Sequence, residues 1–408
     1  MTGAILRNRS ARILIGLIAG LTIGILLTGN GMGPVVVGVA QPVGKLWLDA
    51  LTMTVVPLVF ALLVTGIMEA ARQASGGKVA AVAIGWFAII LVASSLLAAL
   101  TTTLMLDIAP LPSGTAALTS AVDGEPAPVG AVRWLDGIIP TNPIRAAADT
   151  AIVPLVVFAL LFGLGASGIE AEPRAALQQL FQGVGQTMLR IVGWILWIAP
   201  IGVFALAIGV GVRMGSGAAG VLAHYVLVVI GACLSATALS YVAAVLFGGI
   251  APLAFARAAL PSQVIALSTQ SSLASLPAMV SAAGPLRANP AAAGIVLPLA
   301  VSLFRAASAA ANVAVAIYLA HVHGVPTDIT TLVGGALVAA AVSVAAVGLP
   351  AQVSFFAIIA PVCLAMGVPV ILLPLLLAIE TLPDIFRTLG NVTADLAVTT
   401  IVSRLRVP

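Results

Sequence analysis

Residues 369–404, PVILLPLLLAIETLPDIFRTLGNVTADLAVTTIVSR, are mostly apolar but include a set of polar and charged side chains. On a single helix that turns by about 100° per residue, these side chains fall on one face, within a stripe about 100° wide. A water-soluble amphipathic helix has a broad polar side, so we expect this narrow polar face to be the buried one. The side chains of the stripe are Glu380, Asp384, Arg387, Thr388, Asn391 and Asp395.

The composition of the chain predicts the environment of this helix. Of 408 residues, 61% are hydrophobic and 7% are charged, and the mean hydropathy is +1.21. Soluble globular proteins carry about 25% charged residues, so we predict an all-α, polytopic membrane protein. The two cysteines and three histidines have no disulfide or metal-ligand spacing. The net charge of +4 does not indicate nucleic acid.

Ionisable residues inside a membrane helix are costly and normally face a cavity, a partner or a substrate path. The simplest structural explanation of the stripe is one ion pair between Asp384 and Arg387, which are three residues apart. One ion pair does not need four more polar groups on the same face. We therefore favour a functional site.

Positive charges near the chain ends predict how the chain is oriented across the membrane. By the positive-inside rule, Arg7, Arg9 and Arg12 before the first apolar segment place the N-terminus in the cytoplasm. A cleaved secretory signal peptide begins in a similar way. We expect this segment to remain uncleaved, because a long hydrophobic chain needs a first helix to start insertion into the membrane. Arg404 and Arg406 place the C-terminus on the same side if the number of full crossings is even.

The spacing of apolar segments changes near residue 250. Before it, segments at about 11–27, 43–68, 79–106, 151–168, 177–210 and 220–247 are predicted to cross the membrane, and 107–150 forms a proline-rich external loop. After it, regions 253–285 and 330–366 each hold two short apolar pieces around a Ser/Thr/Gln or Gly/Pro interruption, with an apolar segment at about 294–319 between the two regions.

Each short piece is too short to cross a bilayer alone. Two interrupted hairpins at corresponding positions indicate a binding site between inverted repeats. Irregular backbone at membrane depth must also face protein or a wet cavity. Two ordinary helices kinked by proline and serine are the alternative, and the paired occurrence favours hairpins.

Several motifs together resemble one family, the dicarboxylate/amino acid:cation symporters, which include glutamate and aspartate transporters. The last helix carries the most specific match, because several functional residues stand in register there. The motifs are LTMTVVPLVF at 51–60, IPTNP at 139–143, APIGVFA at 199–205, TQSS at 269–272 with SLP at 275–277, and DIFRT at 384–388 followed by NVTAD at 391–395.

The resemblance implies eight transmembrane helices plus two re-entrant hairpins, a homotrimer in the cell inner membrane, and an elevator mechanism in which a transport domain slides through a scaffold. The implied scaffold comprises 1–77 and 108–215, and the transport domain comprises 78–107 and 216–408. Within the transport domain, the hairpins lie at about 253–285 and 328–366, and the seventh and eighth helices at about 288–322 and 369–405.

The chemistry of the stripe suits an acidic amino acid. Arg387 offers a fixed fork of donors for a carboxylate, and Asp384, one turn earlier, can hold an ammonium group. By resemblance, Arg387 takes the side-chain carboxylate and Asp384 the amino group. Asn391 with Ser271 and Ser272 of the first hairpin, chiefly Ser272, takes the α-carboxylate. Thr388, Ser308 and the backbone near Gly348 complete the implied pocket.

Family branches that move amino-free dicarboxylates tend to lack the aspartate found here at 384. The resemblance therefore favours aspartate or glutamate over succinate. Sodium- or proton-coupled symport of C4-dicarboxylates or of neutral amino acids is the alternative.

Helix seven departs from the family pattern. The family carries an Asn-Met-Asp-Gly-Thr signature that supplies oxygens to sodium, but residues 304–308 read FRAAS. The third helix should offer a tyrosine and has only Ser94 and Ser95 as hydroxyl groups within 86–100. Sodium needs several oxygen ligands, so one ion site is expected to be lost. Asp395 and Ser343 match positions of two other ion sites.

Arg305 is a new charge at the position of the family's methionine. We hypothesise that its guanidinium replaces a bound cation by pairing with Asp395 or Glu380, because a lone arginine in hydrocarbon costs several kcal/mol. The alternative is that Arg305 snorkels to water. If sodium is not the driver, a proton on Glu380, Asp384 or Asp395 is the next candidate, with Glu380 as a possible carrier. Facilitated exchange of the substrate without a coupled ion is a further alternative.

Other classes of protein fit the sequence less well. An enzyme would need a base near Ser271 or Ser272, and no histidine lies near them in sequence, so no catalytic residue and no cofactor other than Na⁺ or H⁺ is predicted. A channel would need a filter repeat, which the chain lacks. A membrane sensor that binds an amino acid without moving it is the third alternative.

Overall fold

The computed structural model describes residues 9–29, 31–75, 77–112, 115, 138–215, 217–345 and 351–405. Every regular element in these ranges is a helix, which confirms the all-α prediction. By length and composition, four of the described helices or continuous helix pairs can cross a membrane, or five if one bent pair is a single span. The eight crossings expected from the sequence stay a prediction.

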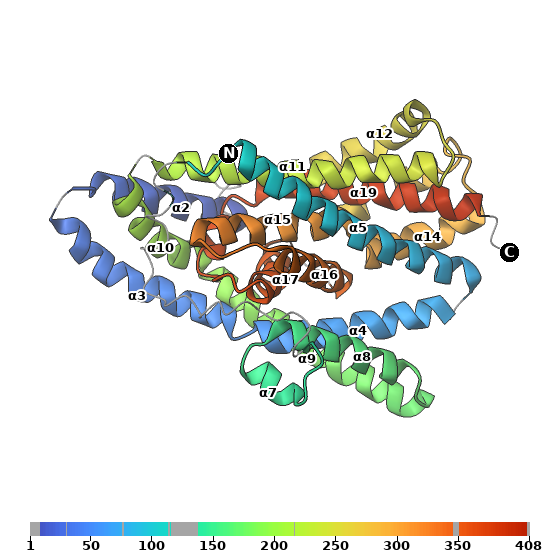
Figure 1. The fold of residues 1–408 in the computed structure, drawn as a ribbon, viewed down its shortest axis with the longest axis horizontal. Coiled ribbons are helices and arrows are strands. Elements are labelled where there is room, and N and C mark those ends of the chain that lie inside the picture. The colour runs from blue at the N-terminus through green and yellow to red at the C-terminus, as the bar shows by residue number, and fades with distance from the viewer. Residues whose placement is uncertain are drawn as a thin grey trace.

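One group of helices lies toward the left and bottom of Figure 1. The α2 helix packs on α10, α10 packs on α3, and α4 packs on α8 and α9. The bounds are α2 (Arg9–Leu26), α3 (Met32–Thr52), α4 (Val55–Ser75), α7 (Pro143–Ala148), α8 (Ile152–Ser167), α9 (Ala171–Trp197) and α10 (Ala199–Met214).

Glycines let α2 approach α10 closely. Gly16, Gly20 and Gly24 recur every four residues and face backbone carbonyls of α10. A Cβ atom added at Gly20 would lie 2.5 Å from the carbonyl oxygen of Phe204. Small residues at this spacing are the usual means of close packing between membrane helices.

The predicted segment 177–210 is not one helix. The α9 and α10 helices meet at a bend of 59° around Ile198. Pro200 has no amide hydrogen to continue the ladder, and its ring clashes with the preceding turn. Near the bend, the indole Nε1 of Trp47 donates to the carbonyl of Ile195 at 2.9 Å. The ring of Trp47 also fills the space that a side chain at Gly202 would need.

The second group contains the polar stripe. The α15 helix is buried along almost its whole length and packs against α5, α11, α16, α17 and α19 (Figure 1). The bounds are α5 (Lys78–Ile108), α11 (Gly217–Leu246), α12 (Pro252–Thr269), α13 (Ser272–Ala282), α14 (Pro290–Leu303), α15 (Ala306–His323), α16 (Ile329–Ala345), α17 (Ala351–Ala365), α18 (Leu373–Leu377) and α19 (Thr381–Arg404).

The two interrupted regions each contain a pair of packed helices. The α12 and α13 helices pack together, and the chain reverses at Gln270, which adopts a left-handed conformation with φ of 52°. The α16 and α17 helices also pack on each other. Packed helix pairs therefore occur in both regions, 253–285 and 330–366, and that they form re-entrant hairpins stays a prediction. Residues 346–350, which include Gly348, lie outside the described residues.

The apolar segment 294–319 is interrupted in its middle. The α14 helix ends at Leu303 and α15 begins at Ala306, so Phe304 and Arg305 are not helical. The interruption lies where the resemblance aligns residues 304–308 with the family's Asn-Met-Asp-Gly-Thr signature. Phe304 stacks on Phe87 of α5 with ring centroids 4.7 Å apart.

Candidate functional site

The stretch 369–404 is divided into two helices, which corrects the prediction of a single one. The short α18 and the long α19 are separated by a turn at residues 378–380. Pro383 cannot donate to the carbonyl of Ile379, and Leu382 donates to that carbonyl at 3.3 Å instead. Glu380 therefore precedes α19 rather than lying on its face.

Burial of the polar stripe is confirmed for all of its members. Their exposed fractions lie between 0% for Asp395 and 8% for Asp384. Because these groups are removed from solvent, each must find a partner in the protein or in a ligand.

Arg387 is the centre of a buried cluster of charges. Its Nη2 atom forms an ion pair with Oε1 of Glu380, and its Nη1 atom lies 3.8 Å from Oδ1 of Asp384. The hydroxyl group of Tyr225 in α11 donates to the other oxygen of Glu380 at 3.2 Å. The Nε atom of Arg387 has no hydrogen-bond partner among the described residues. The guanidinium is thus partly occupied by protein carboxylates and keeps free donors.

Asn391 connects α19 to the interruption before α15. Its Oδ1 accepts hydrogen bonds from the backbone amides of Ala307 at 3.0 Å and Ser308 at 3.2 Å. Its Nδ2 donates to the hydroxyl of Ser308 at 3.0 Å. Arg305, the N-cap residue of α15, makes no side-chain capping bond. Asn391 therefore caps α15 from another helix, as a local Asn N-cap would do.

Of the five charged residues described in this cluster, Asp395 and Arg305 are the two that form no ion pair. Asp395 is fully buried, and neither carboxylate oxygen has a hydrogen-bond partner in the part of the chain that is described. Arg305 is half-buried and makes no ion pair with a described residue; the carboxylates of Asp384 and Asp395 act on it electrostatically. The pairing of Arg305 with Glu380 is not formed, because Glu380 pairs with Arg387.

Other predicted ion-site residues are buried nearby in the packing. Ser343 of α16 accepts a hydrogen bond from Nδ2 of Asn312 in α15 at 3.5 Å. Ser94 and Ser95 of α5 are both fully buried, and their hydroxyl groups have no partner among the described side chains and backbone. Phe304 places an aromatic ring, not an oxygen, at the interruption of α14 and α15.

The serines of the first hairpin have different surroundings. The hydroxyl of Ser271 accepts from the amide of Ala274 at 3.2 Å and so caps α13. Ser272 is half-buried, and its hydroxyl makes no hydrogen bond within the described ranges. No hydrogen bond in those ranges joins either serine to Arg387. The hairpin is linked to α19 by Gln263, which donates to Thr393 at 2.9 Å.

Three buried residues that sequence reasoning did not select belong to this region. They are Tyr225, Asn312 and Gln263, which contact Glu380, Ser343 and Thr393 respectively. Asn312 and Gln263 could have been selected from the sequence, because each is a side-chain amide inside an apolar run. Nothing in the local sequence distinguishes Tyr225 from a packing residue.

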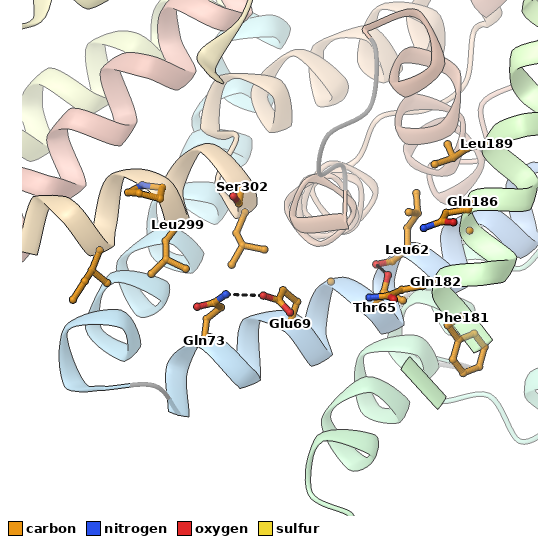
Figure 2. A pocket seen from close by; sticks show the side chains of 15 residues that line it. Leu62, Thr65, Glu69, Gln73, Phe181, Gln182, Gln186, Leu189, Leu299 and Ser302 are labelled. Atoms are coloured by element: carbon orange, nitrogen blue, oxygen red, sulfur yellow. Dashed lines mark hydrogen bonds between the residues drawn. The ribbon is translucent and has the colours of Figure 1, made fainter. Parts of the chain in front are cut away.

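A cavity of about 750 Å³ lies away from these residues, between α4, α9 and α14 (Figure 2). Glu69 and Gln73 of α4 are hydrogen-bonded at 2.6 Å on one wall, and Gln182 and Gln186 of α9 line another. Ser302 of α14 faces it from the third. Glu69 is also paired with Arg72 at 2.5 Å. None of the predicted site residues that the structure describes lines this cavity.

Comparison with known proteins gives one consistent result. The model of the sodium:dicarboxylate symporter family matches residues 10–405. A proton/sodium-glutamate symport protein of Bacillus caldotenax is 29% identical over 405 residues, covering 96% of this chain and 93% of the relative. C4-dicarboxylate transport protein 1 of Pseudomonas aeruginosa (strain UCBPP-PA14) is 27% identical, covering 98% and 89%. The proton/glutamate-aspartate symporter of Escherichia coli (strain K12) is 25% identical, covering 94% and 90%.

Proposed function

The chain belongs to the sodium:dicarboxylate symporter family and is a multi-pass membrane transporter rather than an enzyme, and we propose that its substrate is an acidic amino acid, aspartate or glutamate. The observation that carries the proposal is the buried pair of Arg387 and Asp384 on one turn of α19. A guanidinium with a free Nε donor suits a carboxylate, and the adjacent carboxylate suits an ammonium group.

The C4-dicarboxylates are the second candidate, because several relatives are named C4-dicarboxylate transport proteins. A substrate without an amino group would bring no cation to Asp384, which is 8% exposed. It would also add negative charge to a site in which Asp384 shares Arg387 with Glu380, and buried excess negative charge is unfavourable. This favours the amino acids over succinate.

Weakened or absent sodium coupling is the second part of the proposal. Five buried or half-buried charges act on one another: the carboxylates of Glu380, Asp384 and Asp395 and the guanidiniums of Arg305 and Arg387. Arg305 supplies a positive charge to Asp395 without a metal ion. The ring of Phe304 at the helix interruption offers no oxygen ligand to sodium.

The same charges argue for a proton as the coupling ion. With all five groups ionised, the site carries three negative charges and two positive charges, which leaves one excess negative charge. A substrate of net charge −1 raises the excess to two negative charges. Buried excess charge is normally removed by neutralisation. Protonation of one carboxylate would achieve this, so proton coupling fits the site better than sodium coupling.

The transport movement is proposed to be of the elevator type within a homotrimer, with both termini in the cytoplasm. The two groups of packed helices support this: α2, α3, α4, α8, α9 and α10 in one, and α5 with α11 to α19 in the other. The first group corresponds to the scaffold implied by the family resemblance, and the second to the transport domain.

The test combines binding and uptake. The purified protein is titrated with L-aspartate, L-glutamate and succinate in choline and in sodium buffer, and is then reconstituted in liposomes for counterflow. We expect the amino acids to bind in both buffers and to exchange across the membrane. Binding of succinate alone would overturn the substrate assignment, and binding only in sodium would overturn the coupling assignment. Binding without counterflow would indicate a sensor.

A further inference from the structure

Arg387, to which the proposed function assigns a substrate carboxylate, already has a carboxylate partner in the protein. The partner is Glu380, whose Oε1 pairs with the terminal Nη2 atom. Glu380 is 4% exposed and Arg387 is 6% exposed, so the pair is held away from solvent. A substrate carboxylate that binds the same nitrogen has the same charge and geometry as Glu380, and the two must compete.

The position of Glu380 allows such competition. It lies in the turn between α18 and α19, seven residues before Arg387, rather than on the regular part of the helix. A single hydrogen bond from Tyr225 holds its other oxygen, at 3.2 Å. Rotation of the Glu380 side chain away from Arg387 therefore breaks one ion pair and requires no change in α19.

Displacement leaves Glu380 without a positive neighbour. Among the described residues, Arg387 is the one cation that acts on Glu380, whereas Asp384 has both Arg387 and Arg305. A buried carboxylate that loses its partner becomes neutral rather than staying charged. A proton taken from water onto Glu380 achieves this, and the resulting hydroxyl can donate to the oxygen of Tyr225.

We propose that Glu380 competes with the substrate carboxylate for Arg387 and takes up one proton when it is displaced. This inference rests on the proposed function and deepens it, because it makes one residue responsible for proton uptake and for the affinity of acidic substrates. The other titratable or charged groups that face Glu380 or its partner Tyr225 in the described ranges are Arg387, Asp384, Cys233 of α11 and Cys363 of α17.

The test is calorimetric titration of the full-length protein with L-aspartate in two buffers that differ in ionisation enthalpy, which counts the protons taken up. We expect uptake of about one proton for the wild type. Glu380→Gln keeps the shape of the side chain but cannot compete as an anion. It should bind L-aspartate about tenfold tighter, which is 1.4 kcal/mol, and should take up no proton.

Two further variants separate competition from simple positioning of Arg387. Tyr225→Phe removes the bond that holds Glu380, and we expect a several-fold change in affinity with proton uptake retained. Glu69→Gln makes the same chemical change in α4, outside the site, and should behave as the wild type. If Glu380→Gln does not fold, the proposal is tested by the pH dependence of binding. The affinity of the wild type for L-aspartate has to rise as the pH falls, and the affinity of Tyr225→Phe has to rise in the same way.

Each outcome has a distinct meaning. Weaker binding of L-aspartate by Glu380→Gln, or unchanged proton uptake, overturns the role of Glu380 while the transporter assignment stands. Affinities of the wild type and of Tyr225→Phe that do not depend on pH overturn it as well. If neither the wild type nor Glu69→Gln binds aspartate, glutamate or succinate, the proposed function itself is wrong.

Discussion

Replacement of Asn391 by alanine tests whether this residue holds the interruption of α14 and α15 in place. The substitution removes the acceptor of two buried backbone amides, those of Ala307 and Ser308, and the donor to the Ser308 hydroxyl. Each buried amide left unpaired costs about 1–3 kcal/mol. Two of them give about 2–6 kcal/mol, and because single substitutions rarely exceed about 4 kcal/mol, we expect a loss of about 2–4 kcal/mol.

Two matched variants provide reference values for this loss of stability. Ser308→Ala removes only the acceptor of Nδ2 and should cost about 1 kcal/mol. Asn289→Ala removes a similar cap from the start of α14, where Oδ1 accepts from the amide of Ala291 at 2.9 Å. That cap is exposed to solvent, so water replaces it and the loss should be about 1 kcal/mol or less.

The assay is thermal unfolding of the purified protein together with hydrogen exchange at the amides of Ala307 and Ser308. We expect Asn391→Ala to unfold at a clearly lower temperature than Ser308→Ala and Asn289→Ala, and the two amides to lose protection selectively. Equal destabilisation by all three variants, or unchanged protection at both amides, would refute the assignment of Asn391 as the cap of α15.

Further predictions concern the charges and the packing. Arg305→Met should lower the affinity for L-aspartate in choline buffer and make binding respond to sodium; an unchanged sodium response in titrations contradicts the cation-replacement proposal. Gly20→Leu should destabilise the protein by several kcal/mol, because its side chain meets the carbonyl of Phe204, and normal thermal stability would disprove the close packing of α2. Hydrogen bonds from Thr331 and Thr330 hold the pKa of Asp328 below its usual 3.8, so its stabilisation of the start of α16 is present above the unfolded pKa and is lost as pH falls through the folded pKa. The protection factors of the first α16 amides, measured against the intrinsic exchange rate at each pH, should therefore fall at acid pH in the wild type, and Asp328→Asn should abolish that pH dependence.

The polar stripe shows how much of the site is visible in the sequence. Its members share a helical period with a long apolar stretch, and burial of that face follows from the proportions alone. The structure confirms the burial of all six side chains. The period cannot show where the helix begins, and Pro383 moves Glu380 off the helix and into the preceding turn.

The interruptions were predictable where the chain itself carries the cause. Serine, glycine and proline in the regions 253–285 and 330–366 predict paired short helices, and the structure has them. The bend between α9 and α10 was missed although Pro200 is its local cause, because one proline near the middle of a long apolar segment is also compatible with a single kinked helix.

By itself, the sequence determined that this is an all-helical membrane protein, which faces are buried, and which side chains carry charge into the interior. These properties follow from composition and local period. Tertiary structure alone decided the pairing of those charges: Glu380 with Arg387 and Tyr225, and Asn391 with the start of α15. Tyr225 and the start of α15 lie far from Glu380 and Asn391 in the chain, and Glu380 reaches Arg387 from the turn before α19. No local pattern therefore encodes which of several equally polar groups meet when the helices pack.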